Sequence, residues 1–424
     1  MALVLFGTLF LMLLLNIPIA ISLGIAVVVA LLTGDTATSY VVLVQRMFTS
    51  VDNFPFMAVP FFILAGELME KGGISSRLIR FANVLLKRLP ASLAIVTTAA
   101  SAFFGAISGS NPATVAAIGG LMHPAMVRAG YPSDKAAAVA AASGTLGVII
   151  PPSIPMVTYG IVASVSIGTM FIAGIIPGLL LALGIMLTSV LTCKGHEKKD
   201  IHARESVWAA FKEAIWALLM PVIILGGIYG GVFTPTEASS VACMYAFLVS
   251  MYIYKELKFS QLPEIFGKAA TSTALVLFVV SLSSPFSWLM TSGGVPTKLA
   301  GTMLGLFQNE IFILLAINFI LLFLGCFLET QAIILLMTPM LLPLAQALGI
   351  HPVALGIIIV VNTSIGMITP PMAVNLFVAS GIAKISIEEI SKKIIPFLIV
   401  ESLILVVLTY FSEIIMWLPN LIGK

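Results

Sequence analysis

The sequence predicts an all-α polytopic membrane protein made of two related halves that cross the bilayer in opposite orientations. The chain is 60% hydrophobic and 9% charged, with a mean hydropathy of +1.14. A soluble fold of this length would need more charged residues to cover its surface. Apolar segments of about 20 residues, the length that crosses a bilayer, recur from end to end. A long internal repeat, described next, supplies the third observation.

The repeat relates residues 101–159 to residues 320–378. With an offset of 219, Ala113, Pro124, Gly130, Gly147, Ile149, Pro151 and Pro152 match Ala332, Pro343, Gly349, Gly366, Ile368, Pro370 and Pro371. Each copy has an apolar run broken by small polar residues, a return run, and a third run broken by a Pro-Pro pair. Unwound backbone at membrane depth is tolerated only where it lines a cavity or binding site. Paired breaks therefore predict a transport site.

The first half is predicted to span residues 1–193. Apolar runs predict scaffold helices within 1–70, interrupted at Asn16-Ile17-Pro18 and by a polar loop, TGDTATSY. The basic, amphipathic segment within 71–90 is typical of an arm at the membrane interface. A re-entrant hairpin and a broken helix follow within 91–163, and the apolar stretch 168–193 is a span.

The second half repeats this plan over residues 216–424. A charged linker at 194–215 precedes it and is predicted to be cytoplasmic. Scaffold helices are expected within 216–291, an interfacial arm at 296–309, a hairpin and broken helix within 310–380, and a final span at 395–418. Each half then crosses the membrane about five times, not counting its hairpin.

The distribution of positive charge predicts the orientation of both halves. The segments 71–90, 128–135, 194–212, 255–268 and 384–393 hold 18 of the 21 lysines and arginines. Cytoplasmic loops are enriched in these residues, so this side is predicted to face the cytoplasm. Equivalent loops carry opposite bias, because 71–90 is basic while 296–309 has one lysine. This contrast predicts inverted topology.

The polar breaks have the chemistry of ion and anion sites. At Ser108–Thr114 one helix should end and another begin, with Ser110 or Asn111 as the N-cap and Pro112 at the first helical position. The N–H groups of a half-helix start suit a carboxylate, and the free carbonyls and hydroxyls beside it suit Na⁺. The breaks 144–153 and 362–371 repeat this pattern. The structural alternative is a set of proline-kinked helices stabilised by their neighbours.

Four acidic residues lie near membrane depth, where such groups are costly and often functional. Glu329 lies at the second hairpin turn and is interpreted either as a group near a cation site or as a helix cap. Glu67 and Glu401 are interpreted as packed or span-end residues. Glu237 is predicted to form a capping box with Thr234. The cysteines, Cys193, Cys243 and Cys326, are interpreted as packing residues, and the histidines form no metal pair.

Four motifs together carry a family resemblance: SGSNPATVAAIGG, GTLGVIIPPSIPMVTYG, GGVFTPTEASS and NTSIGMITPPMAVNLFVA. They resemble the large membrane subunit of tripartite ATP-independent periplasmic (TRAP) transporters over essentially the whole chain. The resemblance implies an elevator-type carrier in the bacterial inner membrane, with hairpins and broken helices in a mobile domain and the remaining spans in a scaffold. It implies import of an organic acid, such as a C4-dicarboxylate or sialic acid, driven by Na⁺. The expected partners are a small four-helix membrane subunit and a periplasmic substrate-binding protein, with no nucleic acid and no cofactor besides the coupling ion.

The site hypothesis follows from the breaks and the resemblance. One Na⁺ is expected at Ser108, Ser110, Asn111 and Thr145 with backbone oxygens near Gly147, and another at Asn362, Thr363, Ser364 and backbone near Gly366. The substrate carboxylate is expected between them, on the half-helix starts near Pro112 and Ser153. The residues expected to contact the substrate are Asn111, Pro112, Thr114, Pro152, Ser153, Thr330 and Thr369.

Three other functions compete with this hypothesis. A proton-coupled or binding-protein-independent carrier of the same superfamily would use Glu329 as the proton site. A channel would need a ring of like groups around a pore, which two asymmetric hairpins do not supply. An intramembrane enzyme is the remote alternative: Gly105–Gly109 is similar to the Gly-x-Ser-Gly of rhomboid proteases, but with the spacing one residue off.

Overall fold

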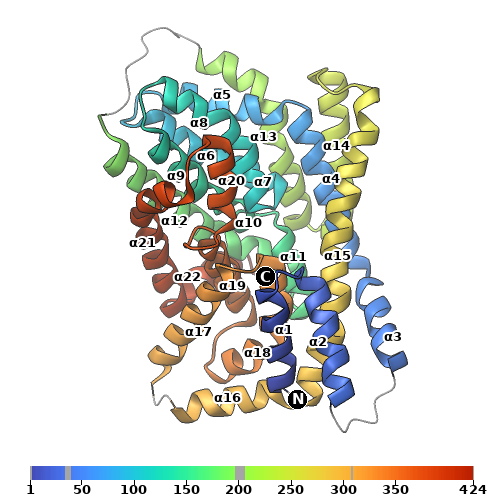
Figure 1. The fold of residues 1–424 in the computed structure, drawn as a ribbon. Helices are drawn as coiled ribbons and strands as arrows, with labels where there is room; N and C mark the ends of the chain where they lie inside the picture. Colours follow the sequence, from blue (N-terminus) through green and yellow to red (C-terminus); the bar gives the residue numbers. More distant parts are fainter. Residues whose placement is uncertain (1, 34–39, 196–205, 307–308, 424) are drawn as a thin grey trace.

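A computed structural model describes residues 2–33, 40–195, 206–306 and 309–423, and all regular structure in these ranges is helical. Most helices run along the long axis of the molecule, with α5 at one end and α16 at the other (Figure 1). The helices before residue 195 are α1 (Ala2–Leu14), α2 (Ile19–Thr33), α3 (Tyr40–Val51), η1 (Phe54–Met57), α4 (Ala58–Lys71), α5 (Ile74–Leu86), α6 (Ser92–Ser108), α7 (Asn111–Thr114), η2 (Val115–Gly119), α8 (Gly120–Arg128), α9 (Ser133–Gly144), α10 (Leu146–Ile149), α11 (Ile154–Val162) and α12 (Ile167–Cys193).

The second half follows the same order. Its helices are α13 (Val207–Tyr229), α14 (Pro235–Leu248), η3 (Val249–Ile253), η4 (Phe259–Gln261), α15 (Leu262–Ser292), α16 (Val295–Leu306), α17 (Glu310–Gly325), α18 (Thr330–Ala347), α19 (Pro352–Gly366), α20 (Val374–Ala383), α21 (Ile387–Tyr410) and α22 (Glu413–Ile422). Among the described residues, six helices are long and apolar enough to cross a membrane, and two bent helix pairs raise this to eight. The chain is therefore a polytopic membrane protein.

Several boundaries differ from those predicted. The expected final span, 395–418, is two helices, because α21 begins at Ile387 and the chain turns at Phe411 before α22. The polar first turn of α21 is helical because the Ser386 hydroxyl accepts a hydrogen bond from the Glu389 N–H (3.3 Å). Helix α13 begins at Val207, inside the predicted linker. The linker residues 196–205 and the loop residues 34–39 lie outside the described part of the chain.

The first two apolar runs are shorter than spans. Helices α1 and α2 contain 13 and 15 residues, against about 20 for a helix that crosses a bilayer unaided. They pack on each other, and α2 packs on the long helix α15. Helix α3 follows, an element that the sequence analysis does not predict. The capping box at the start of α14 is confirmed, since Glu237 accepts from the Thr234 N–H (2.8 Å) and the Thr234 hydroxyl accepts from the Glu237 N–H (3.3 Å).

The broken helices form the centre of the molecule. Every residue from Val353 to Gly366 in α19 is buried, and so is every residue from Ala136 to Ile149 in α9 and α10. A helix that is apolar all round is expected inside a bundle. The peptide bond within each Pro-Pro pair is cis. The polar side chains of these segments therefore lie in the core.

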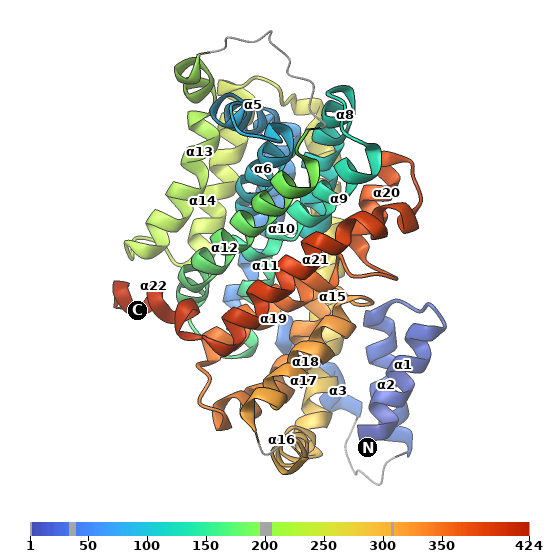
Figure 2. The same cartoon turned by 90° about the vertical axis from the view of Figure 1, so that its left-hand side faces the viewer.

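Contacts divide the other long helices into two groups. In one group α1 packs on α2, α2 on α15, α15 on α4 and α4 on α14, while α13 packs on α14 and on α5. Helices α12 and α21 lie side by side on the opposite face, where α12 packs on α6 and α19 and α21 packs on α9 and α19 (Figure 2). The resemblance places every span besides the hairpins and broken helices in the scaffold, but α12 and α21 pack with the hairpins and broken helices instead.

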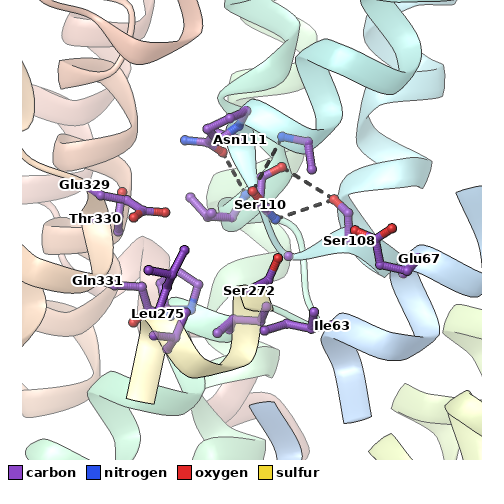
Figure 3. A pocket seen from close by; sticks show the side chains of 18 of the residues that line it. Ile63, Glu67, Ser108, Ser110, Asn111, Ser272, Leu275, Glu329, Thr330 and Gln331 are labelled. Atoms are coloured by element: carbon purple, nitrogen blue, oxygen red, sulfur yellow. Dashed lines mark hydrogen bonds between the residues drawn. The ribbon is translucent and has the colours of Figure 1, made fainter. Parts of the chain in front are cut away.

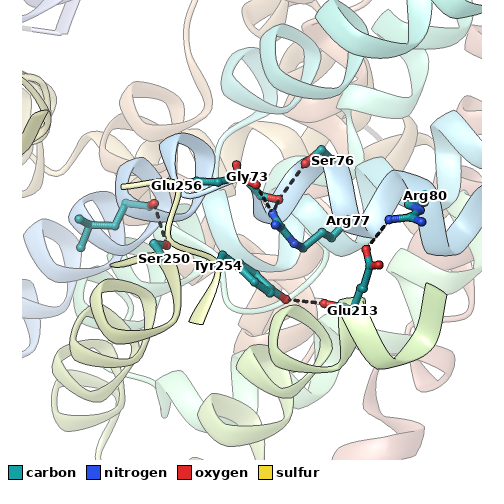
Figure 4. Close-up of polar contacts among 9 residues, drawn as sticks. Gly73, Ser76, Arg77, Arg80, Glu213, Ser250, Tyr254 and Glu256 are labelled. Carbon is teal, nitrogen blue, oxygen red and sulfur yellow. Dashed lines mark hydrogen bonds and ion pairs between the residues drawn. The ribbon is translucent and has the colours of Figure 1, made fainter. Parts of the chain in front are cut away.

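The basic segments meet at one end of the molecule. Arg77 of α5 pairs with Glu256 (2.6 Å) and stacks on the Tyr254 ring at 3.8 Å (Figure 4). Arg80 pairs with Glu213 of α13, and Lys71 with Glu264 (3.8 Å). The arm α5 is thus tied to α13 and to the connection between α14 and α15. The α16 arm lies at the opposite end (Figure 1).

Candidate functional site

The two hairpin tips meet at a cavity of about 250 Å³ in the middle of the molecule (Figure 3). The hairpins supply the tip between α6 and α7 and the tip between α17 and α18, while α4 and α15 form the facing wall. The polar residues that line the cavity are Glu67, Glu70, Ser108, Ser110, Asn111, Ser272, Glu329, Thr330 and Gln331. Segments that are more than 200 residues apart in sequence therefore share one polar cavity.

The first hairpin tip is built by a helix end, a glycine and a helix start. Helix α6 stops at Ser108, and Gly109 takes a left-handed conformation (φ +59°) in which its backbone lies against Ile154. Ser110 is the N-cap of α7, and its hydroxyl accepts from the Ala113 N–H (3.5 Å). The Thr114 hydroxyl donates to the Ser110 carbonyl (2.8 Å) and lies 3.1 Å from the Ser108 hydroxyl. The helix start predicted here is confirmed, with Ser110 as the cap.

Asn111 joins the hairpin to both broken helices. Its Oδ1 accepts a hydrogen bond from the Val148 N–H (2.9 Å), which fixes the orientation of the amide. Its Nδ2 donates to the Ser364 hydroxyl (2.6 Å), and Ser364 in turn donates to the Thr145 carbonyl (2.7 Å). The two predicted Na⁺ sets therefore share one hydrogen-bond network instead of forming two separate groups.

Asn362 and Thr363 point away from this network. The Asn362 amide donates to Asn318 Oδ1 of α17 (3.0 Å), and the Asn318 amide donates to the Thr409 hydroxyl of α21 (3.0 Å). The Thr363 hydroxyl donates to the Ile359 carbonyl of its own helix (2.8 Å). The three residues predicted as one set, Asn362 to Ser364, thus face different neighbours, because consecutive helical residues project about 100° apart.

The equivalent polar contact in the first half joins Thr98 and Ser143, whose hydroxyls lie 3.0 Å apart. Thr98 lies on α6 and Ser143 on α9, just as Asn318 lies on α17 and Asn362 on α19. Each half therefore fastens the first arm of its hairpin to its broken helix by a buried polar pair.

Two predicted glycines allow backbone to approach backbone. A Cβ at Gly147 would lie 2.5 Å from the Ser110 carbonyl oxygen, and a Cβ at Gly366 would lie 2.5 Å from the Gly325 Cα. Both distances are too short for any side chain. These glycines hold each broken helix against its hairpin, a packing role that the sequence interpretation as carbonyl ligands does not include.

The remaining predicted substrate residues divide between cavity and core. Pro112 and Thr330 line the cavity, whereas Thr114, Pro152, Ser153 and Thr369 do not. Ser153 is the buried N-cap of α11, and its hydroxyl finds no hydrogen-bond partner among the described residues. The Thr369 hydroxyl donates to the Ile365 carbonyl of the preceding helix (2.9 Å).

The acidic residues correct one sequence interpretation, that of Glu67, and decide between the two alternatives for Glu329. Glu67 of α4, taken as a packed residue, points into the cavity beside Ser108 (Figure 3). Glu329 occupies the N-cap position of α18 but makes no capping hydrogen bond, so its carboxylate faces the cavity instead. Glu401, also taken as packed, is fully buried. Sequence reasoning missed Glu70, Ser272 and Gln331, and only Gln331 carried a signal, because it lies beside Thr330 at the hairpin tip.

Comparisons with known proteins agree with this architecture. A family model described as "Tripartite ATP-independent periplasmic transporter, DctM component" matches residues 6–414. The isethionate TRAP transporter permease protein DctMQ of Oleidesulfovibrio alaskensis is 45% identical over 419 residues, which are 98% of this chain and 66% of that protein. The C4-dicarboxylate TRAP transporter large permease protein DctM of Rhodobacter capsulatus is 39% identical over 438 residues, covering 100% of this chain and 99% of the relative.

Two further similarities extend the comparison. The sialic acid TRAP transporter large permease protein SiaM of Vibrio cholerae is 37% identical over 409 residues, 96% of this chain and 95% of the relative. The crystal structure of the YdaH transporter of Alcanivorax borkumensis matches with a TM-score of 0.62 at 16% identity, over 88% of this chain and 89% of that one, which shows similarity of fold alone. The chain therefore belongs to the DctM component family, the large permeases of TRAP transporters, a family of membrane transport proteins and not of enzymes.

Proposed function

We propose that this chain imports a small organic anion across the bacterial inner membrane, coupled to the inward flow of Na⁺. The observation that carries the proposal is the cavity between the hairpin tips, where the starts of α7 and α18 meet hydroxyl and amide side chains. Helix starts present free N–H groups and positive dipole ends to an anion. Paired half-helix ends at the centre of a bundle are the arrangement that secondary transporters use.

The substrate class follows from the cavity and from the relatives. The relatives named above take isethionate, C4-dicarboxylates and sialic acid, all of them organic anions. The cavity of about 250 Å³ is smaller than the roughly 300–1,000 Å³ of sites for drug-sized ligands. Among these substrates, the proposal favours an acid of two to four carbons over the larger sialic acid.

The proposed mechanism is of the elevator type and uses two inverted repeats. The hairpins, broken helices, α12 and α21 would move as one body against α1–α4 and α13–α15, with α5 and α16 as connecting arms. Na⁺ would bind at the oxygen-rich network of Ser108, Ser110, Thr145 and Ser364 before the substrate enters. A periplasmic binding protein would deliver the acid, and a small four-helix membrane subunit would complete the complex.

Uptake into proteoliposomes tests this proposal. The chain would be reconstituted with its small subunit, and each candidate binding protein would be added with its acid, with and without an inward Na⁺ gradient. Uptake that requires both Na⁺ and a binding protein supports the proposal and identifies the substrate. Uptake driven by Na⁺ alone contradicts delivery by a binding protein. Uptake driven only by protons contradicts Na⁺ coupling and moves the coupling role to Glu329, which faces the cavity.

A further inference from the structure

Glu401 is a buried acid that the proposed site does not use. It lies in the middle of α21 and is 0% exposed. Neither carboxylate oxygen has a hydrogen-bond partner among the described residues. An ionised carboxylate buried without a partner is among the costliest groups a protein core can hold. Such a carboxyl is held either in its protonated form or beside a bound cation.

The helices packed on α21 supply no cation to pair with it. They are α9, α12, α17, α19 and α20. Their charged residues lie at helix ends: Asp134 pairs with Lys393 (3.7 Å), Lys135 donates to the Thr192 carbonyl (2.8 Å), and Glu310 begins α17. Among the described residues, one polar side chain interacts with the Glu401 carboxyl, the Thr145 hydroxyl. That hydroxyl already donates to the Ala142 carbonyl (2.7 Å), so it does not satisfy the acid.

Thr145 lies at the junction of α9 and α10, because it caps the end of the first helix and the start of the second. Its carbonyl accepts a hydrogen bond from Ser364 (2.7 Å), and its hydroxyl donates to the Ala142 carbonyl (2.7 Å), so oxygen atoms are concentrated at this junction. A bound cation would stabilise a carboxylate beside them, because carboxylate, hydroxyl and carbonyl oxygens are all ligands for a hard cation.

The other half of the protein shows that the fold does not need this acid. Helices α12 and α21 each contain an internal proline, Pro177 and Pro396, at equivalent positions. Five residues further on, α12 has Ala182 where α21 has Glu401. Ala182 is also buried, at 5% exposed. The same packing position is filled by a methyl group in one half and a carboxylate in the other.

We propose that Glu401 is the anionic ligand of a buried Na⁺ site at the end of α9, completed by the Thr145 hydroxyl and neighbouring carbonyl oxygens. One carboxylate balances one positive charge, which favours a monovalent ion over a divalent one. The site is distinct from the cavity but connected to it by two hydrogen bonds. The Thr145 carbonyl accepts one from the Ser364 hydroxyl, and the Ser364 hydroxyl accepts one from the Asn111 amide. The ion would hold the end of α9 in the position that organises the hairpin tip. The identity of the ion as Na⁺ rests on the proposed function.

The test compares thermal unfolding of the purified full-length chain with its small subunit, in choline chloride and in NaCl. The wild type and Glu401→Gln are measured, with Glu413→Gln on the exposed start of α22 as the matched control. In choline chloride, E401Q should unfold at the same temperature as the wild type or at a higher one, because the substitution removes an uncompensated charge. In NaCl, the unfolding temperatures of the wild type and of E413Q should rise above that of E401Q. Equilibrium binding of ²²Na⁺ should show the loss of about one bound ion per chain in E401Q, because the network at the hairpin tip would still bind its own Na⁺.

Each other outcome overturns the inference. A carboxyl with a purely structural role predicts that E401Q is less stable than the wild type in both salts, or does not fold. Unchanged Na⁺ binding in E401Q also contradicts the site while leaving Na⁺ coupling intact. A wild type that binds no Na⁺ at any concentration contradicts both this inference and the proposed function. Proton-driven uptake that is lost in E401Q, with no Na⁺ binding, assigns Glu401 to a proton instead.

Discussion

At the residue scale, neighbouring polar residues in one broken helix have different roles because the helix points them in different directions. Ser364 faces Asn111 and Thr145, while Thr363 bonds its own helix and Asn362 faces α17. A motif of three polar residues therefore does not define one site. The contacts of each side chain decide which residue belongs to the transport network.

Ser364→Ala should impair transport far more than Thr363→Ala. Losing the Ser364 hydroxyl leaves the Asn111 amide N–H and the Thr145 carbonyl unpaired in the core, at a cost of about 1–3 kcal/mol for each unsatisfied group. We expect the Na⁺ concentration for half-maximal uptake to rise about tenfold in S364A and less than threefold in T363A. Uptake at graded Na⁺ concentrations measures both. If S364A and T363A raise this Na⁺ concentration equally, the hydrogen-bond network around Ser364 does not couple Na⁺ binding to transport.

Gly366→Ala should be strongly destabilising because the new methyl group would lie 2.5 Å from the Gly325 Cα. Overpacking of this kind costs about 1–3 kcal/mol and would push the second hairpin away from α19. The control is Gly381→Ala in α20, where nothing lies within 4 Å of the added carbon and alanine favours the helix. Thermal unfolding should show a lower midpoint for G366A and an equal or higher one for G381A. A G366A midpoint equal to that of the wild type would contradict the close packing.

At the element scale, α5 links two parts of the molecule. Its polar face is tied to the loop after η3 and to α13, while its other face packs on α6 of the first hairpin. The Arg77 guanidinium donates to the Gly73 carbonyl (2.8 Å), pairs with Glu256 and stacks on Tyr254 (Figure 4). One arginine thus holds the start of the arm by three different interactions.

Arg77→Ala should loosen the arm more than Glu256→Ala does. The ion pair is partly exposed, so we expect it to contribute only about 0.2–1 kcal/mol, and the cation–π contact with Tyr254 about as much again. R77A loses both of these interactions and the hydrogen bond to the Gly73 carbonyl, whereas E256A loses the ion pair alone. Unfolding midpoints in low and high salt distinguish the two contributions, because salt should weaken the ion pair and leave the stacking on Tyr254 unchanged. If R77A and E256A are equally destabilising in low salt, the stacking contributes nothing.

At the scale of the whole molecule, two groups of helices surround one buried centre. The basic arm α5 and the nearly uncharged arm α16 lie at opposite ends, as the charge distribution predicts for halves of opposite orientation (Figure 1). The hairpin tips meet between these ends. A cavity at this depth suits alternating access, in which each end opens in turn.

The orientation can be tested by labelling single cysteines in a chain without Cys193, Cys243 and Cys326. Ser76→Cys on α5 and Thr302→Cys on α16 are both at exposed positions. A membrane-impermeant maleimide added to spheroplasts should label T302C at once. It should label S76C only after the membrane is permeabilised, because Lys- and Arg-rich segments stay in the cytoplasm. Labelling of both cysteines in intact spheroplasts would contradict the opposite orientation.

The class of the protein and the position of its breaks follow from the amino-acid sequence alone. Composition requires a membrane, since so apolar a chain cannot be covered by its few charges. Small polar residues and proline break helices through local chemistry, so the hairpin tip at Ser110 and the capping box at Thr234 were predictable from neighbouring residues. The repeat offset indicated which breaks correspond.

Which side chains share a site depends on how distant segments of the chain pack together. Asn111 meets Ser364 across 253 positions, and Glu67 reaches the cavity from a helix that the repeat does not include. The end of the last span at Phe411 was invisible because α22 is as apolar as a span. Glu401 looked like a packed residue because its environment comes from other helices. Local sequence sets backbone conformation, but burial and partnership depend on contacts between distant segments, which no local pattern contains.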